Sequence, residues 1–265
     1  MPFVDMINLD DARFMYFCEK IELTRYFLKL AYDGTNYSGW QIQPKVTTVQ
    51  GTLEAALKIL VKDFRALIGC GRTDTGVHAF EYYAHFDTEY PLWPEFLYKI
   101  NAILPKDIAV YECKEVDGQL HARFSADYRE YKYFMHFKKI PFKNAYSVYH
   151  VKQLDLDLMN EASSFLIGKK DFSSFSKSNT QVKTNICNVQ KAEWEPIADG
   201  LVLTIGANRF LRNMVRAIVG TLLPIGEGME PPDRILEVLE EKDRSSAGKS
   251  AHPQGLFLNR INYPD

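Results

Sequence analysis

Cysteine is scarce in this sequence, and the few thiols are not arranged as metal ligands or as a redox pair. The 265 residues contain four cysteines and six histidines. No two cysteines form a Cys-x-x-Cys pair, and no cysteine stands at metal-ligand spacing from a histidine. A P-loop and a His-Glu-x-x-His pattern are missing too. We therefore expect buried free thiols and no metal site, and the sequence does not favour a nucleotide-dependent enzyme or a zinc hydrolase.

Long apolar runs are also missing. None approaches the roughly 20 residues that a helix needs to cross a bilayer. The longest candidate, residues 205–225, is interrupted by Arg209, Arg212 and Arg216. The first twenty residues contain four acidic side chains and lack the basic and apolar regions of a secretory signal. We therefore expect no membrane partner and a cytoplasmic location.

An excess of positive charge is missing as well. The chain has 32 Lys and Arg residues against 34 Asp and Glu residues, for a net charge of −2. This balance counts against a nucleic-acid partner, because such proteins are often basic. The charges are unevenly distributed, however. Residues 227–243 are mostly acidic, whereas residues 138–143 and 209–216 hold basic side chains and no acidic ones. The sequence is therefore compatible with a basic cleft on a mildly acidic body.

Hydrophobic patterning predicts two successive sets of mixed strands and helices. In the first half, strands are predicted at 24–32, 65–70, 81–87 and 108–113, and helices at 48–61 and 94–102. This β-α-β-β-α-β order is ferredoxin-like and builds an antiparallel sheet with helices on one face. In the second half, strands are predicted at 129–137, 192–195, 200–205 and 256–261, and helices at 156–166, 208–223 and 231–239. The second half is therefore consistent with a duplicated architecture.

The segment Gly69–Ala79, with the sequence GCGRTDTGVHA, carries the strongest chemical signal. It connects two predicted strands, and its internal glycines allow backbone conformations that other residues resist. These glycines flank a polar stretch that contains Arg72 and Asp74. A nearby cation favours the ionised form of a carboxylate, and a positioned carboxylate can act as a nucleophile or a base. Asp74 could equally be a turn residue that accepts backbone hydrogen bonds, and the spacing alone leaves both interpretations open.

Six segments, in the right order, resemble the TruA family of tRNA pseudouridine synthases. The family signature is similar to GRTDTGVHA within the glycine-rich segment. The other five segments are YDGTNYSGWQIQP (32–44), NAILPKDIAV (101–110), FSADYREYKYF (124–134), DFSSF (171–175) and NRFLRNMVRAIVG (208–220). The resemblance extends from about Thr24 to Tyr263 and so covers nearly the whole chain.

This resemblance implies a reaction and the residues that carry it. Such enzymes break the bond between ribose C1′ and uracil N1 and rejoin the ring through its C5, without a cofactor or a metal. Asp74 matches the essential catalytic carboxylate. Three residues match substrate-binding positions: Arg72 handles the flipped nucleotide, Tyr131 lies against the uracil as a stacking surface and proton acceptor, and Arg216 keeps Asp74 ionised and oriented. Whether Asp74 attacks the sugar, attacks the ring or assists an elimination stays open.

Each of these residues also has an ordinary structural interpretation. Arg72 and Arg216 could be surface side chains, and Tyr131 could be a sheet aromatic in the core, with Tyr133 on the same face. Asn213 departs from the family pattern, because a His is often found at its position. Candidate phosphate contacts, at least half of which we expect to be ordinary surface, are Lys138, Lys139, Lys143, Lys169, Lys170, Lys177, Lys183, Arg209 and Arg212.

We predict an α+β (mixed α/β) protein of two ferredoxin-like halves with the catalytic cleft between them. Residues 1–23 would be an N-terminal extension, 24–125 the first domain with the Asp74 loop, and 126–265 the second. The resemblance implies a homodimer whose substrate is the anticodon stem-loop of tRNA, at positions 38, 39 and 40. The alternatives are a hydrolase with an Asp nucleophile, a non-catalytic RNA-binding module, and a pseudouridine synthase that acts at other RNA positions.

Overall fold

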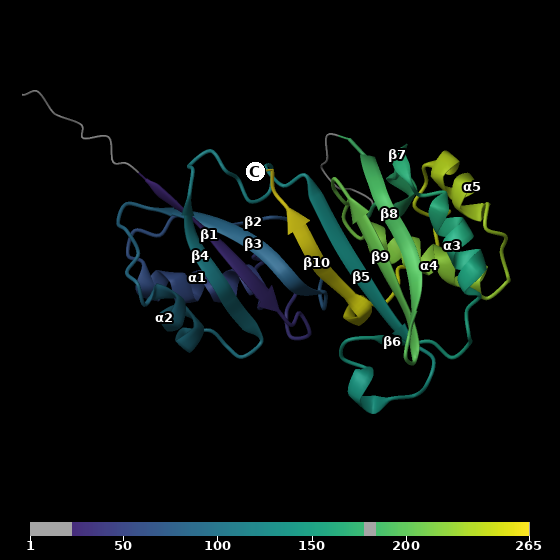
Figure 1. The fold of residues 1–265 in the computed structure, drawn as a ribbon, viewed down its shortest axis with the longest axis horizontal. Coiled ribbons are helices and arrows are strands. Elements are labelled where there is room, and N and C mark those ends of the chain that lie inside the picture. Colours follow the sequence, from purple (N-terminus) through teal and green to yellow (C-terminus); the bar gives the residue numbers. More distant parts are fainter. Residues whose placement is uncertain (1–22, 178–183, 265) are drawn as a thin grey trace, which may run out of the picture.

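The structure, a computed structural model, describes residues 23–177 and 184–264. Across these ranges a single ten-stranded sheet runs through the molecule, and five α-helices pack beside it. Figure 1 shows two groups of elements along this sheet, with the last strand of the chain between them. The predicted N-terminal extension lies outside the described residues, except for Leu23. No helix in the described ranges is long and apolar enough to cross a membrane.

The first group is built from the first half of the chain. In chain order its elements are β1 (Thr24–Tyr32), α1 (Val49–Leu60), β2 (Ile68–Gly69), β3 (His78–Thr88), α2 (Phe96–Ile103) and β4 (Ile108–Val116). Strand β1 lies between β3 and β4 and is antiparallel to both, and β2 pairs with β3. The spatial order β4-β1-β3-β2 is therefore that of a ferredoxin-like fold.

The second group repeats this construction. Its elements are β5 (Tyr128–His136), α3 (Leu156–Ser164), β8 (Ile186–Ile197), β9 (Gly200–Ala207), α4 (Met214–Gly226) and β10 (Leu256–Asn262). Strand β5 lies between β9 and β10, and β8 pairs with the outer side of β9. The order β10-β5-β9-β8 matches that of the first group. The predicted mixed α/β fold is therefore confirmed, with β6 (Val148–Tyr149), β7 (Gly168–Asp171) and α5 (Arg234–Glu241) as additions.

Strand β10 connects the two groups into one sheet. It pairs antiparallel with β5 and, over two residues, parallel with β3, where Phe257 lies opposite His78. Leu256 packs in the hydrophobic core of the second group, whereas Leu258 and Ile261 pack in the core of the first. The chain end therefore stabilises both cores. We propose the boundary at residues 125 and 126 as the division between two domains, with β10 shared at their junction.

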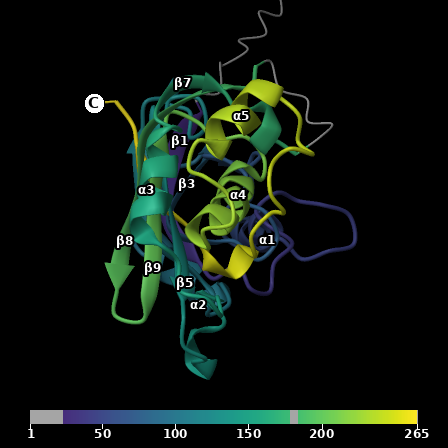
Figure 2. The ribbon, with the colours of Figure 1, turned by 90° about the vertical axis from the view of Figure 1, so that its right-hand side faces the viewer.

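Local sequence explains the elements that position the site. In β1 the buried residues Tyr26, Leu28, Leu30 and Tyr32 alternate along the strand and face the core. Helix α1 begins after Thr48, whose side-chain oxygen accepts a hydrogen bond of 3.2 Å from the backbone N–H of Gly51. Figure 2 shows that α1 and α4 lie on the same side of the sheet. The cleft described below opens on this side, between the two groups.

Two predicted elements differ from the structure near the site. The helix expected at 208–223 begins only at Met214, because Asn213 adopts a left-handed conformation with φ of 68° that ends any helix before it. The strand expected at 65–70 is reduced to β2, since only Ile68 and Gly69 pair with β3. Both corrections turn regular structure into loop. The loop after β2 and residues 208–213 both line the cleft described below.

Candidate active site

A cleft of about 920 Å³ lies between the two groups of elements, and both contribute to its walls. One wall is the loop of residues 70–77 between β2 and β3, called here the glycine-rich loop. The opposite wall consists of residues 208–213 between β9 and α4, called here the arginine segment. Side chains of β5 and β10, among them Tyr131 and Leu258, also line the cleft. The site therefore combines segments that are far apart in the sequence.

Positive charge dominates this cleft although the chain as a whole is slightly acidic. Among the described residues that line it, Asp74 is the single carboxylate, and the six basic side chains are all arginines: Arg72, Arg123, Arg129, Arg209, Arg212 and Arg216. Guanidinium groups bind phosphate in a planar, two-pronged geometry. The cleft is thus suited to a polyanion that places one reactive group beside one carboxylate.

Asp74 and Arg216 meet across the cleft, although 142 positions separate them in the sequence. Arg216 donates from Nη1 to Oδ2 of Asp74 over 3.3 Å, and both side chains are about one-fifth exposed. Its Nε donates to the backbone carbonyl of Ala251 over 2.7 Å. The carbonyl therefore orients the guanidinium, and the guanidinium in turn orients the carboxylate. This is the pairing that the resemblance implied, and the catalytic role of either residue stays a prediction.

Tyr131 lies on β5 and lines the cleft. Its ring meets Phe210 edge-on, with centroids 5.1 Å apart. Burial raises the pKa of its phenol, and the nearby Cys70 and Asp74 add to this shift. The hydroxyl group is therefore neutral at physiological pH. Tyr131 thus presents a flat ring and a hydroxyl group that can donate a hydrogen bond. Tyr133, two residues on, is 1% exposed and donates to the carbonyl of His252, so it is a core residue.

Buried tyrosines hold the glycine-rich loop in place. The hydroxyl of Tyr32 lies 2.9 Å from Oγ1 of Thr73, and Tyr82 donates to the carbonyl of Gly71. The backbone N–H of Trp40 donates to the carbonyl of Thr73 over 3.3 Å. At Gly39, with φ of 83°, a Cβ atom would lie 2.4 Å from that same carbonyl oxygen. These contacts surround Thr73 and so fix the backbone that carries Asp74.

Arg129 connects the bases of both walls, which the sequence patterns did not predict. Its guanidinium donates to four backbone carbonyls, those of Cys70, Arg123, Ala126 and Asn208, over distances of 2.5–3.4 Å. Cys70 begins the glycine-rich loop and Asn208 begins the arginine segment. A guanidinium with five donors is the side chain suited to this bridging task. The only available signal was its position inside the FSADYREYKYF segment.

Some of the remaining predicted residues lie in the cleft and others lie away from it. Arg72 is exposed on one wall of the cleft, and the half-buried Arg209 and the exposed Arg212 are on the other. Lys138 and Lys143 instead pair with Asp199, at 3.6 and 2.7 Å, away from the cleft. Lys183 lies outside the described residues. Of the described candidate phosphate contacts, Arg209 and Arg212 line the cleft, and their contact with phosphate stays a prediction.

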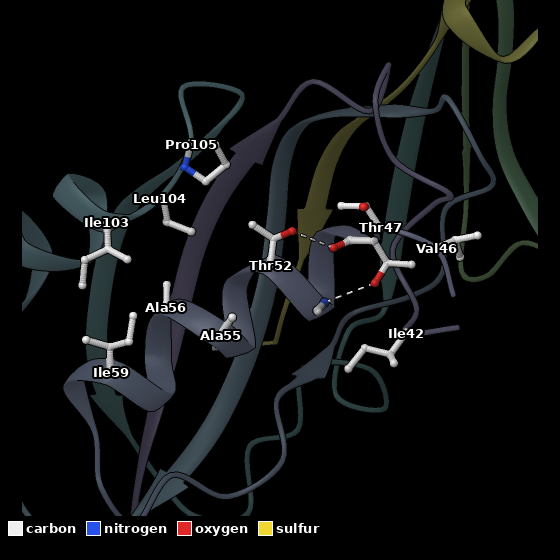
Figure 3. Close-up of a pocket in the computed structure, with 12 residues that line it drawn as sticks. Ile42, Val46, Thr47, Thr52, Ala55, Ala56, Ile59, Ile103, Leu104 and Pro105 are labelled. Atoms are coloured by element: carbon white, nitrogen blue, oxygen red, sulfur yellow. Dashed lines mark hydrogen bonds between the residues drawn. The ribbon is translucent and has the colours of Figure 1, made fainter. Parts of the chain in front are cut away.

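Two further features offer chemical alternatives to Asp74. Cys70 lines the same cleft, but burial raises the pKa of its thiol to about 12, which excludes the thiolate as a nucleophile near neutral pH. A second hollow of about 450 Å³ lies beside α1 (Figure 3), where Ile42, Ile59 and Ile103 are among the lining residues. None of the described residues lining it is titratable. The cleft is therefore the site with the chemical groups that catalysis needs.

Comparisons with known proteins identify the family of the chain. The family model of tRNA pseudouridine synthases matches residues 162–264. The tRNA pseudouridine synthase A of Parabacteroides distasonis is 49% identical, over 92% of this chain and 97% of that protein. The enzymes of that name from Bacteroides thetaiotaomicron and Bacillus subtilis are 47% and 42% identical, over 92% and 88% of this chain and 92% and 97% of theirs.

The chain belongs to the tRNA pseudouridine synthase A family. Identities of this size over nine-tenths of the chain leave no large part of the fold outside the family. The family predicted from the six sequence segments is therefore confirmed, and with it the class of enzyme, an isomerase that acts on tRNA. Asp74, Arg72, Tyr131 and Arg216 all line the cleft of this pseudouridine synthase.

Proposed function

We propose that this chain converts uridine to pseudouridine in the anticodon stem-loop of tRNA, at positions 38, 39 and 40, with Asp74 as the catalytic carboxylate. The observation that carries the proposal is the pairing of Asp74 with Arg216 inside a cleft whose other charged side chains are all arginines, among the residues described. A polyanionic RNA is the ligand that such a cleft attracts. Asp74 is the single carboxylate among the described residues that line this cleft.

In this proposal each residue has its own task. A uridine in a stem is inaccessible until it leaves the stack, which costs a few kcal/mol. Arg72 occupies the vacated space and stacks on the neighbouring bases. The ring of Tyr131 supports the extruded uracil, while Arg216 holds the carboxylate of Asp74 oriented toward the sugar–base bond. These contacts hold the detached uracil so that it rotates in place and rejoins the ribose through C5.

The isomerisation needs no external reactant. The bond between C1′ and N1 breaks, a bond between C1′ and C5 forms, the proton on C5 leaves, and N1 regains a proton. Electrons and atoms balance within the nucleotide, so we propose that no cofactor or metal takes part. Direct attack on the sugar, attack on the ring and assisted elimination all require the ionised carboxylate of Asp74 beside the reacting bond.

The tRNA substrate extends beyond a single cleft. We propose a homodimer in the cytoplasm, in which the tRNA spans both subunits and the two basic clefts form a longer surface. Such a dimer resolves the conflict between a net charge of −2 and a nucleic-acid ligand. Sedimentation that shows only monomer at micromolar concentration would contradict this part of the proposal.

The test is the release of tritium from C5-tritiated uridine in an unmodified tRNA transcript. We expect release by the wild type and a loss of at least about 1,000-fold with Asp74→Asn, because the amide can serve neither as nucleophile nor as base. Release by both would show that Asp74 is not the catalytic group. No release by either, with tRNA still bound, would indicate an RNA-binding module or a different RNA position, and mapping the modified uridines would separate these two.

A further inference from the structure

Phe124 is an apolar ring on the wall of a charged cleft. Its side chain is 75% exposed, yet it lines the same cleft as Asp74. The guanidinium of Arg123 lies 5.5 Å from the centre of the ring. Exposure of a phenylalanine side chain forfeits burial that is worth roughly 1.5–3 kcal/mol. A rigid aromatic face beside a cation is the arrangement on which nucleobases stack in proteins that bind single-stranded nucleic acid.

The turn that carries Phe124 is fixed by a histidine. Nδ1 of His121 accepts hydrogen bonds from the backbone N–H groups of Arg123 and Phe124, at 3.1 and 3.2 Å. The backbone N–H of His121 donates to Oγ of Ser125, and the N–H of Ser125 donates back to the carbonyl of His121. Four hydrogen bonds within five residues hold this turn. The exposed ring is therefore preorganised.

The back of the Phe124 ring is also supported. The imidazole of His121 lies 4.4 Å from it at an angle of 36°, and the buried His85 contacts His121 from below at 4.7 Å. Nδ1 of His85 accepts a hydrogen bond from the backbone N–H of Ala122. Burial lowers the pKa of both histidines, so their Nδ1 atoms remain acceptors at neutral pH. The ring thus rests on a layer anchored in the sheet, while its side chain stays 75% exposed.

We propose that Phe124 is a stacking platform for a second nucleobase of the RNA, distinct from the uridine that Asp74 attacks. This inference rests on the proposed function, because it needs the same RNA in the same cleft. At about 920 Å³ the cleft is at the upper end of the range of small-molecule pockets, roughly 300–1,000 Å³, so it has room beyond one uridine. The arginines around it hold the phosphates on both sides of the stacked base.

The platform gives the unstacked strand a place to rest. When the target uridine leaves the stem, its neighbours lose a stacking partner. A base stacked on Phe124 regains part of that loss and holds the strand in an open conformation. Such a contact is tolerant of sequence, because every base has a flat face. Phe124 therefore acts as an RNA-binding residue that favours the flipped state without selecting a particular neighbour.

The test measures binding of a synthetic anticodon stem-loop RNA by the full chain that carries Asp74→Asn, so that no turnover occurs. We expect Phe124→Leu to weaken binding by roughly 5- to 100-fold, the range that loss of one base–aromatic stack produces. Phe124→Trp keeps an aromatic face and should bind as tightly as the parent. Tyr98→Leu is the matched control, because Tyr98 is 78% exposed on α2 and does not line the cleft.

Two further readouts distinguish stacking from a general loss of affinity. The salt dependence of binding should be unchanged in Phe124→Leu, since no phosphate contact is removed. The fluorescence of 2-aminopurine, placed in turn at each nucleotide beside the target, should be quenched at one position by the parent and not by Phe124→Leu. Equal affinity and equal quenching for parent and Phe124→Leu would overturn the proposal.

The fate of the proposed function is read separately, from tritium release by the chain with Asp74 intact. Release with equal binding by parent and Phe124→Leu rejects the platform and keeps the isomerase. No release with weakened binding by Phe124→Leu keeps the platform and rejects the isomerase. Failure of every variant, including the parent, to bind the stem-loop rejects the platform whatever the assay of release shows.

Discussion

The two walls of the cleft are held in different ways. Thr73, beside Asp74 in the glycine-rich loop, is only 8% exposed and is tied by Tyr32 and by the backbone of Trp40. The arginine segment is anchored by its backbone, with the carbonyl of Asn208 bound to Arg129, while Arg212 stays exposed. Asp74 thus lies on a wall whose partners belong to the core, whereas the opposite wall is held through its backbone and leaves a long side chain exposed.

This difference corresponds to two physical demands. Chemistry at one bond needs reacting groups held within a fraction of an ångström, because a misplacement of about 1 Å can cost 100-fold in rate. Contacts to phosphates fix the register of the RNA and tolerate adjustment of flexible cations. Arg216 connects the two walls. Its backbone lies on α4, which follows the arginine segment, and its side chain binds Asp74 on the other wall. Variants on each wall should therefore separate rate from affinity.

After the loss of Asp74 itself, the largest effect is expected where the two walls meet. Arg216→Lys keeps the positive charge but removes the guanidinium, which binds both Ala251 and Asp74. A single ammonium group takes its place. We expect the single-turnover rate to fall by about 100-fold or more, as for the loss of one preorganised donor at a reacting group. Affinity for tRNA, measured by fluorescence polarisation, should change less than about threefold. An unchanged rate would show that Arg216 does not orient Asp74.

A smaller effect is expected from the buried support of the glycine-rich loop. Tyr32→Phe leaves the hydroxyl of Thr73 without its partner, which should cost about 1–3 kcal/mol in the free energy of unfolding and reduce kcat about tenfold. Tyr26→Phe is the matched control, because this buried tyrosine on the same strand accepts a hydrogen bond from Leu92, far from the loop. Urea unfolding and kcat check both. Equal loss of kcat in the two variants would contradict a positioning role.

The smallest effect is expected on the arginine segment. Arg212→Ala should weaken tRNA binding a few-fold and reduce the slope of log affinity against log salt by about 0.7–0.9, the value for one phosphate contact. The rate at saturating tRNA should be unchanged. Arg65→Ala serves as the control, since Arg65 is exposed and paired with Glu89 outside the cleft. If both variants have the parental slope, Arg212 does not contact phosphate.

Much of the fold could be predicted because short-range patterns suffice for it. Strand β1 occupies the predicted residues, and α1 is within one residue of the prediction at each end. In both, apolar side chains recur at the period of the element, so the buried face is visible in the sequence. The predicted start of α4 was wrong, because the left-handed conformation of Asn213 is stabilised from outside the helix. Its side-chain amide donates a hydrogen bond to Ser250. No local pattern encodes such a partner.

The residues of the candidate site also divide into those that the sequence identifies and those that only the structure identifies. Asp74, Arg72, Tyr131 and Arg216 could be named from the sequence, because each lies in a segment that resembles the family. Arg129 and Phe124 could not be given tasks. The value of Arg129 depends on four carbonyls gathered from three loops, and that of Phe124 depends on an exposure that only packing determines. Backbone acceptors have no side-chain signature, so contacts of this kind are invisible in a sequence.

The sequence by itself determined the types and order of most elements, the family and the residue types available for catalysis, since these depend on local period and on motifs of a few neighbouring residues. Only the tertiary structure decided that β10 joins both halves and that six arginines and one carboxylate line the described cleft. It also decided that Arg216 reaches Asp74. The physical reason is distance along the chain. Charge and hydrogen bonding act through space, and folding alone brings residues 142 positions apart within 3.3 Å.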